Sequence, residues 1–179
     1  MKLADFETYN SLVAMFLDRA ATRGDQPFLS AKHGGQWQAI SWAQAAERVC
    51  LLAEGLLGLG LQPGDRVMLV SENRPEWCIA DLAIMAAGLV TVPTYITNTE
   101  RDHLHILENS GARAVIVSTA KLAKPLLSAV FRAECEHVIG IEPLRTAQAG
   151  MVEFHDWAAL LTGDAATARA RRSTRARRP

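Results

Sequence analysis

A polar turn between two apolar segments is the first place in this sequence where side chains could do chemistry. Residues 71–76 read Ser-Glu-Asn-Arg-Pro-Glu and separate the apolar run 66–70 from a helix-like run over 77–87. In α/β proteins the turn after a buried strand commonly carries ligand-binding side chains. The turn could therefore bind a ligand. It could equally serve only to begin a helix, because proline suits a first helical turn and Glu76 complements its positive end.

The motifs that usually hold nucleotides or activate a serine are incomplete or absent from the sequence. Gly58, Gly60 and Gly64 resemble a dinucleotide fingerprint, but the third glycine comes one residue late and the group closes a predicted helix. No GxxxxGK[ST] phosphate loop and no GxSxG nucleophile motif occurs. We therefore predict no catalytic, cofactor-binding or metal-binding residue.

The histidines and cysteines also predict no metal site. His103 and His105 are two residues apart on a predicted helix, so their rings point in different directions, and we expect solvated or capping side chains. Cys50, Cys78 and Cys135 are far apart and form no CxxC pair. We expect them to be buried, reduced thiols of a cytosolic protein.

The elements that must position these residues alternate between helix and strand. A helix over 9–23 and a hairpin of 27–31 with 36–40 precede a helix over 41–59, for which Ser41 and Gln44 have the spacing of a capping box. The alternation then continues through strand 66–70, helix 75–87, strand 89–95, a helix capped by Thr99, strand 113–118, helix 121–132 and strand 137–141. This order predicts an α/β fold, with a mostly parallel sheet flanked by helices.

The charge distribution divides the chain into an acidic body and a basic tail. Residues 1–163 carry 13 Lys and Arg against 18 Asp and Glu, whereas residues 164–179 carry six Arg against one Asp. The segment 165–179 contains only Ala, Arg, Thr, Ser and Pro, so we predict a domain over 1–163 and a disordered tail over 164–179. The tail could attract nucleic acid or anionic lipid, or it could be the product of a frameshift in GC-rich DNA. We favour the frameshift.

The sequence also bears on location and partners. Its amino terminus lacks the layout of a signal peptide, and no apolar run reaches the roughly 18 residues that a membrane span needs. We expect a cytoplasmic protein without a transmembrane segment. No nucleic-acid partner is expected, and peripheral contact with a membrane surface stays open.

Four short motifs carry a resemblance to a known family. They are Pro-Gly-Asp-Arg-Val at 63–67, Ser-Glu-Asn-Arg-Pro-Glu-Trp at 71–77, Val-Pro-Thr-Tyr at 92–95 and Ser-Gly-Ala at 110–112. With them, residues 6–161 resemble the amino-terminal part of AMP-forming acyl-CoA synthetases, members of the adenylate-forming superfamily. The second and third motifs favour long-chain fatty acid–CoA ligases. In that family the turn at 71–76 belongs to the scaffold, so we expect it to begin a helix.

The resemblance implies a two-step reaction. ATP and a carboxylic acid, such as a fatty acid, give an acyl-adenylate, and the thiol of CoA then displaces AMP. ATP, Mg²⁺ and CoA are implied for the full-length family and none is expected for this fragment. The family's phosphate loop, adenine-binding segment and carboxy-terminal domain are missing, and Leu-Thr-Gly-Asp at 161–164 stands too early to be its ribose-binding segment. We therefore predict an amino-terminal fragment that is inactive alone. The alternative is a degenerate, non-catalytic interaction module with a basic tail.

Overall fold

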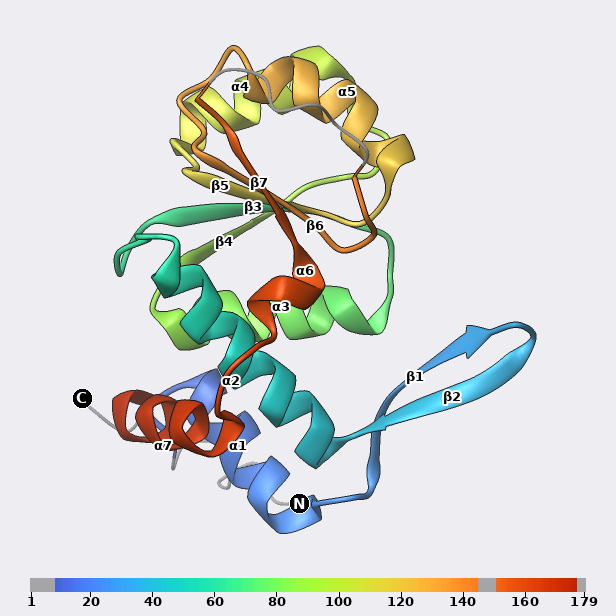
Figure 1. The fold of residues 1–179 in the computed structure, drawn as a ribbon, viewed down its shortest axis with the longest axis vertical. Coiled ribbons are helices and arrows are strands. Elements are labelled where there is room, and N and C mark those ends of the chain that lie inside the picture. Colours follow the sequence, from blue (N-terminus) through green and yellow to red (C-terminus); the bar gives the residue numbers. More distant parts are fainter. Residues whose placement is uncertain (1–8, 145–150, 177–179) are drawn as a thin grey trace.

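A five-stranded parallel sheet forms the centre of the protein (Figure 1). The structure is a computed structural model and describes residues 9–144 and 151–176. The strands have the order β4-β3-β5-β6-β7 and all four neighbouring pairs are parallel. They are β3 (Arg66–Val70), β4 (Val90–Pro93), β5 (Ala114–Val117), β6 (His137–Gly140) and β7 (Glu153–Asp156). The predicted α/β class with a parallel sheet is confirmed.

Helices cover both faces of this sheet, as the alternating sequence requires. α2 (Trp42–Gly58) and α3 (Pro75–Ala87) lie on one face, and α4 (Glu100–Ser110) and α5 (Ala120–Val130) lie on the other (Figure 1). Successive side chains of a strand point to opposite faces. Val67 and Leu69 accordingly join the α2/α3 core, whereas Met68 and Val70 join the α4/α5 core, and all four are fully buried.

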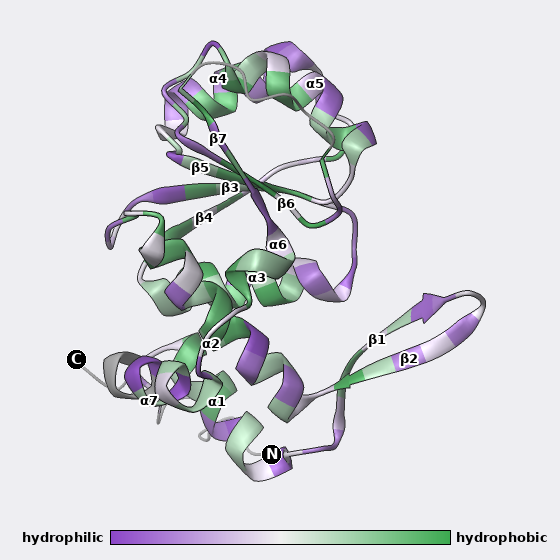
Figure 2. Ribbon diagram, viewed as in Figure 1, coloured by the Kyte–Doolittle hydropathy of each residue, from purple (hydrophilic) through white to green (hydrophobic). Residues whose placement is uncertain are grey.

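The amino-terminal elements are close to their predicted bounds. α1 (Leu12–Arg23) begins after Ser11, whose hydroxyl accepts a hydrogen bond from a backbone N–H, and β1 (Pro27–His33) pairs antiparallel with β2 (Gln36–Ser41). The capping box of α2 is confirmed, because Ser41 and Gln44 each accept a backbone hydrogen bond from the other. The hairpin projects from the body, and hydrophilic residues dominate its outer part (Figure 2).

The carboxy-terminal segment departs most from the sequence-based predictions. The fifth strand β7, the short helix α6 (Trp157–Leu160) and the helix α7 (Ala165–Ala176) were not predicted. Where a disordered tail was expected over 164–179, residues 165–176 form a helix that packs on α2. The predicted boundary between residues 163 and 164 stays a prediction. So does the proposed origin of residues 164–179 in a frameshift.

Two kinds of contact hold α7 in place. Ala168 is 4% exposed and belongs to the α2/α3 core. Arg172 is buried, with its Nη2 atom 2.9 Å from Oε1 of Glu54 on α2, and its Nη1 atom donates to the carbonyl of Ala86. Burying a charged group without a partner costs a large amount of free energy. Because Arg172 is paired with Glu54 and the carbonyl of Ala86, it can be buried and helps to fix α7 against α2.

Candidate functional site

The polar turn after β3 begins a helix, as expected. Pro75 occupies the first turn of α3, and Arg74, the residue before the helix, forms no side-chain cap. Its guanidinium instead pairs with Glu76 at 2.8 Å and with Glu142, in the segment after β6, at 2.9 Å. Trp77 packs partly buried against the α2/α3 core. The turn therefore links the ends of two strands through one arginine.

The topology of the sheet reverses at the carboxyl ends of β3 and β5. From β3 the chain moves outward to β4 and then returns to place β5 on the other side of β3. Open α/β sheets bind their ligands outside the strand ends at such a reversal. Here Glu72 and Ser118 follow the two strands, and the buried hydroxyl of Ser118 donates a hydrogen bond to Oε2 of Glu72. This direct contact connects the two strand ends.

A cavity of about 530 Å³ lies one strand further, between the ends of β3 and β4. Its lining combines aromatic and aliphatic side chains with a few polar groups: Ser71, Glu72, Asn73, Trp77, Pro93, Thr94, Tyr95 and Ile96. The lining contains one carboxylate and no lysine or arginine. A cavity with these walls suits an apolar group better than a phosphate, which needs cations or converging backbone N–H groups.

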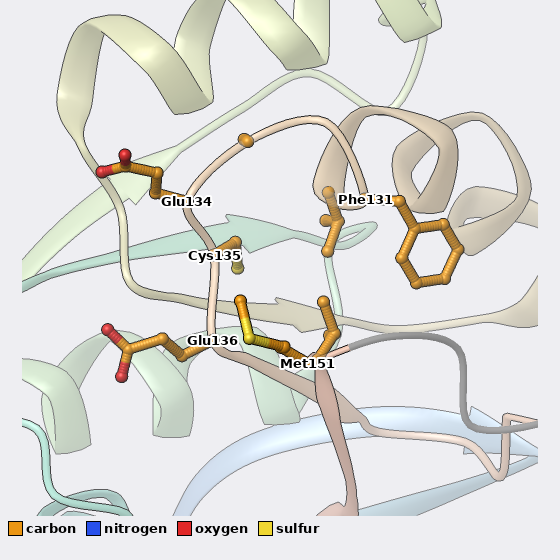
Figure 3. Close-up of a pocket in the computed structure, with 8 residues that line it drawn as sticks. Phe131, Glu134, Cys135, Glu136 and Met151 are labelled. Atoms are coloured by element: carbon orange, nitrogen blue, oxygen red, sulfur yellow. The ribbon is translucent and has the colours of Figure 1, made fainter.

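A second cavity, of about 620 Å³, lies beside β6 and β7 (Figure 3). Phe131, Cys135 and Met151 contribute apolar surface to it, together with Glu134 and Glu136. Burial raises the pKa of the Cys135 thiol to about 12, so the thiol stays protonated at neutral pH. Because the thiolate is the nucleophilic form, this cavity holds no activated cysteine.

The remaining candidate residues have structural positions. Gly60 and Gly64 adopt positive φ angles of 88° and 91° after α2, where the glycines were predicted to close the helix. Asp164 accepts hydrogen bonds from the backbone N–H groups of Ala166 and Thr167 at the start of α7. Asp164, the last residue of the segment 161–164, thus caps α7 in this structure.

The three cysteines are free thiols. Cys50 and Cys135 are buried as expected, whereas Cys78 is only half-buried. Burial raises the pKa of Cys50 to about 11, which keeps this thiol protonated as well. Among the described residues, none of the three belongs to a group that could hold a metal ion.

The prediction for the two histidines of α4 is correct for one and wrong for the other. His105 is exposed, but His103 is 1% exposed and lies one turn before Leu107 on the face that packs against the sheet. Residues four apart share a helix face, so His103 takes a core position. The two side chains therefore lie on different sides of the helix, one buried and one exposed.

His103 should make the protein less stable in mild acid. Burial lowers the pKa of His103, and the neighbouring Asp102 opposes this only in part. On acidification the unfolded chain therefore takes up the proton first. The contribution of His103 to the free energy of unfolding is fully present above about pH 6.5 and decreases as the pH falls below that value. Urea unfolding at pH 7.5 and 5.5 should show a smaller loss for His103→Leu than for the unmodified protein. The matched variant His105→Leu should lose as much free energy of unfolding between pH 7.5 and pH 5.5 as the unmodified protein. An equal decrease in all three proteins would contradict the role of His103.

The comparisons with known proteins agree with this architecture. The sequence model of the family described as "AMP-binding enzyme" matches residues 16–171. The chain belongs to this family. The match extends eight residues past the predicted end of the body at 163.

Relatives and solved structures point to the same group of enzymes. The chain is 35% identical over 111 residues to the long-chain-fatty-acid–CoA ligase FadD15 of Mycobacterium tuberculosis, covering 62% of this chain and 18% of that enzyme. It is 32% identical over 152 residues to a long-chain-fatty-acid–CoA ligase of Escherichia coli O157:H7, covering 83% and 26%. A benzoate CoA ligase from Burkholderia xenovorans LB400 matches with a TM-score of 0.69 and 25% identity over 83% of this chain and 27% of that one. The chain thus spans about a fifth to a quarter of these relatives.

Within the described residues, no helix is both long and apolar enough to cross a bilayer.

Proposed function

We propose that the chain is the amino-terminal part of an AMP-forming long-chain fatty acid–CoA ligase and does not form acyl-adenylate by itself. The observation that carries this proposal is the similarity to two such ligases over only 18% and 26% of their length. The whole enzyme would convert a fatty acid and ATP to acyl-adenylate and pyrophosphate, and CoA would then release AMP and form the thioester.

The lining of the cavity at the ends of β3 and β4 does not favour the triphosphate of ATP. A triphosphate needs several cations or backbone N–H groups that converge on it. The cavity at the ends of β3 and β4 offers Glu72, which repels a phosphate, and no basic side chain. The nearest arginine of the same turn, Arg74, is already paired with Glu76 and Glu142. We therefore assign no step of adenylation to this chain.

The same cavity fits an apolar substrate. Trp77, Pro93, Tyr95 and Ile96 provide its aromatic and aliphatic surface, and Tyr95 is 81% exposed in this chain. An aromatic side chain of this size is usually covered in a folded protein. The proposed role of Tyr95 is to form part of a wall for the acyl chain in the complete enzyme.

ATP–pyrophosphate exchange tests the proposal. The purified chain, with Mg²⁺, ATP and palmitate, should give no exchange above the blank without palmitate. The full-length ligase of Escherichia coli, assayed in parallel, should give strong palmitate-dependent exchange. Palmitate-dependent exchange by the chain alone would refute the claim that it is inactive.

The alternative function as an interaction module has less support from the described residues. That hypothesis relied on a basic tail available to anionic partners. In the structure Arg171 and Arg172 both approach Glu54 on α2, at 3.5 Å and 2.9 Å, so part of the tail's charge is used within the chain.

A further inference from the structure

One histidine of β6 and a glutamate and a histidine of β7 meet at the edge of the sheet. In the parallel pairing of β6 with β7, His137 is opposite Glu153, and His155 lies two residues further along β7 on the same face. Nδ1 of His137 lies 3.2 Å from Nε2 of His155. Oε2 of Glu153 lies 3.6 Å from each of these nitrogens. The three atoms form a nearly regular triangle.

The size of this triangle matches a zinc ion. In the plane of the three atoms, which are separated by 3.2, 3.6 and 3.6 Å, the equidistant point lies about 2.0 Å from each. A small displacement from this plane toward a fourth ligand keeps all three distances within the ordinary Zn–N and Zn–O range of about 2.0–2.2 Å. A plain hydrogen bond between two imidazoles would account for the first separation only. It gives no reason for the carboxylate oxygen to be equally near both nitrogens.

The surroundings also suit a metal ion. His137 is 6% exposed, His155 is half-buried and the Glu153 side chain is 66% exposed, so the ligands are oriented by the sheet while one side of the triangle faces solvent. Nε2 of His137, the ring nitrogen outside the triangle, lies 3.9 Å from Oε2 of Glu136, which is near enough for an ionic contact but too long for a hydrogen bond. Glu136 is itself held by Arg113 through two hydrogen bonds.

We propose that His137, Glu153 and His155 form a binding site for a divalent transition-metal ion of the zinc class. Two imidazoles and one carboxylate favour Zn²⁺, Co²⁺ or Ni²⁺ over Mg²⁺ and Ca²⁺, which prefer sites made of oxygen ligands alone. The fourth position is open to water. The ion would connect the edge strand β7 to β6 and would stabilise the folded chain, since the ligands come together only when the strands pair. This site is separate from the cavity at the ends of β3 and β4 and does not depend on the proposed ligase function.

Metal titration of the untagged chain tests the site. Isothermal calorimetry with Zn²⁺ should give one site per chain, and Co²⁺ should give visible absorption bands of a four-coordinate ion without the sulfur charge-transfer band of a cysteine ligand. Mg²⁺ should give neither heat nor stabilisation. Bound Zn²⁺ should raise the unfolding temperature.

Variants separate this site from nonspecific binding. His155→Gln and Glu153→Gln should each weaken Zn²⁺ binding at least tenfold; the glutamate variant changes an exposed side chain and should fold normally. The matched controls His105→Gln and Glu134→Gln remove exposed ligand types elsewhere and should bind as the unmodified chain does. The proposal is overturned if the chain binds no Zn²⁺ at micromolar concentration, or if the two site variants bind as tightly as the controls.

Discussion

Replacing Ala168 with asparagine should lower the free energy of unfolding by about 2–3 kcal/mol, because a polar side chain larger than alanine would be buried without a partner. Ala168 is 4% exposed where α7 packs on the rest of the chain. Urea unfolding followed by circular dichroism measures the effect. A disordered tail would give a different result, since a substitution in a segment without contacts leaves stability unchanged.

Ala166→Asn is the matched control for this experiment. Ala166 is exposed and lies two residues earlier in α7, so the same substitution costs no more in helix propensity there and buries nothing. We expect its stability to remain within about 0.5 kcal/mol of the unmodified chain. Equal stability of the two variants would show that α7 is not docked on the body.

The elements up to residue 141 were predictable because their signals are local. The capping box of Ser41 and Gln44 marks the start of α2, and the glycines after α3 and α4 mark their ends. The strand 66–70 is apolar except at its first residue, and β3 has these bounds in the structure. Each of these signals occupies a few consecutive residues, so no tertiary contact is needed to interpret it.

The carboxy-terminal elements lack such signals. β7 reads Glu-Phe-His-Asp, and only Phe154 packs against a core, because this strand lies at the edge of the sheet. α7 buries a small alanine and the side chain of Arg172. A search for periodic large apolar residues does not detect a helix that packs through alanine and the stem of an arginine.

The candidate sites show the same division between local and distant information. The sequence placed Glu72 after a strand, but its contact with Ser118 joins residues 46 apart. His137 and His155 were not singled out, since 18 residues separate them and β7 was not predicted. The register of β6 with β7 brings them together, and only the paired strands reveal it.

Replacing Gly55 with valine should separate α6 from α2 and lower the free energy of unfolding by about 2–3 kcal/mol. A Cβ atom at Gly55 would lie 2.7 Å from the carbonyl oxygen of Leu160 and 3.0 Å from its Cβ atom. The first of these atoms belongs to the backbone, so a change of side-chain rotamer cannot relieve the contact. Part of α6 would have to move, and α6 links β7 to α7.

Gly58→Val isolates the steric part of this effect. Gly58 lies in the same helix, one turn later, with no atom within 4 Å of an added Cβ. Valine has a higher helix propensity than glycine, so this variant should be as stable as the unmodified chain or slightly more stable. Helix propensity alone would favour both substitutions, whereas close packing predicts opposite signs at the two positions. Thermal and urea unfolding of the pair distinguishes these cases, and a Gly55→Val protein as stable as Gly58→Val would mean that α6 does not rest on α2 in solution.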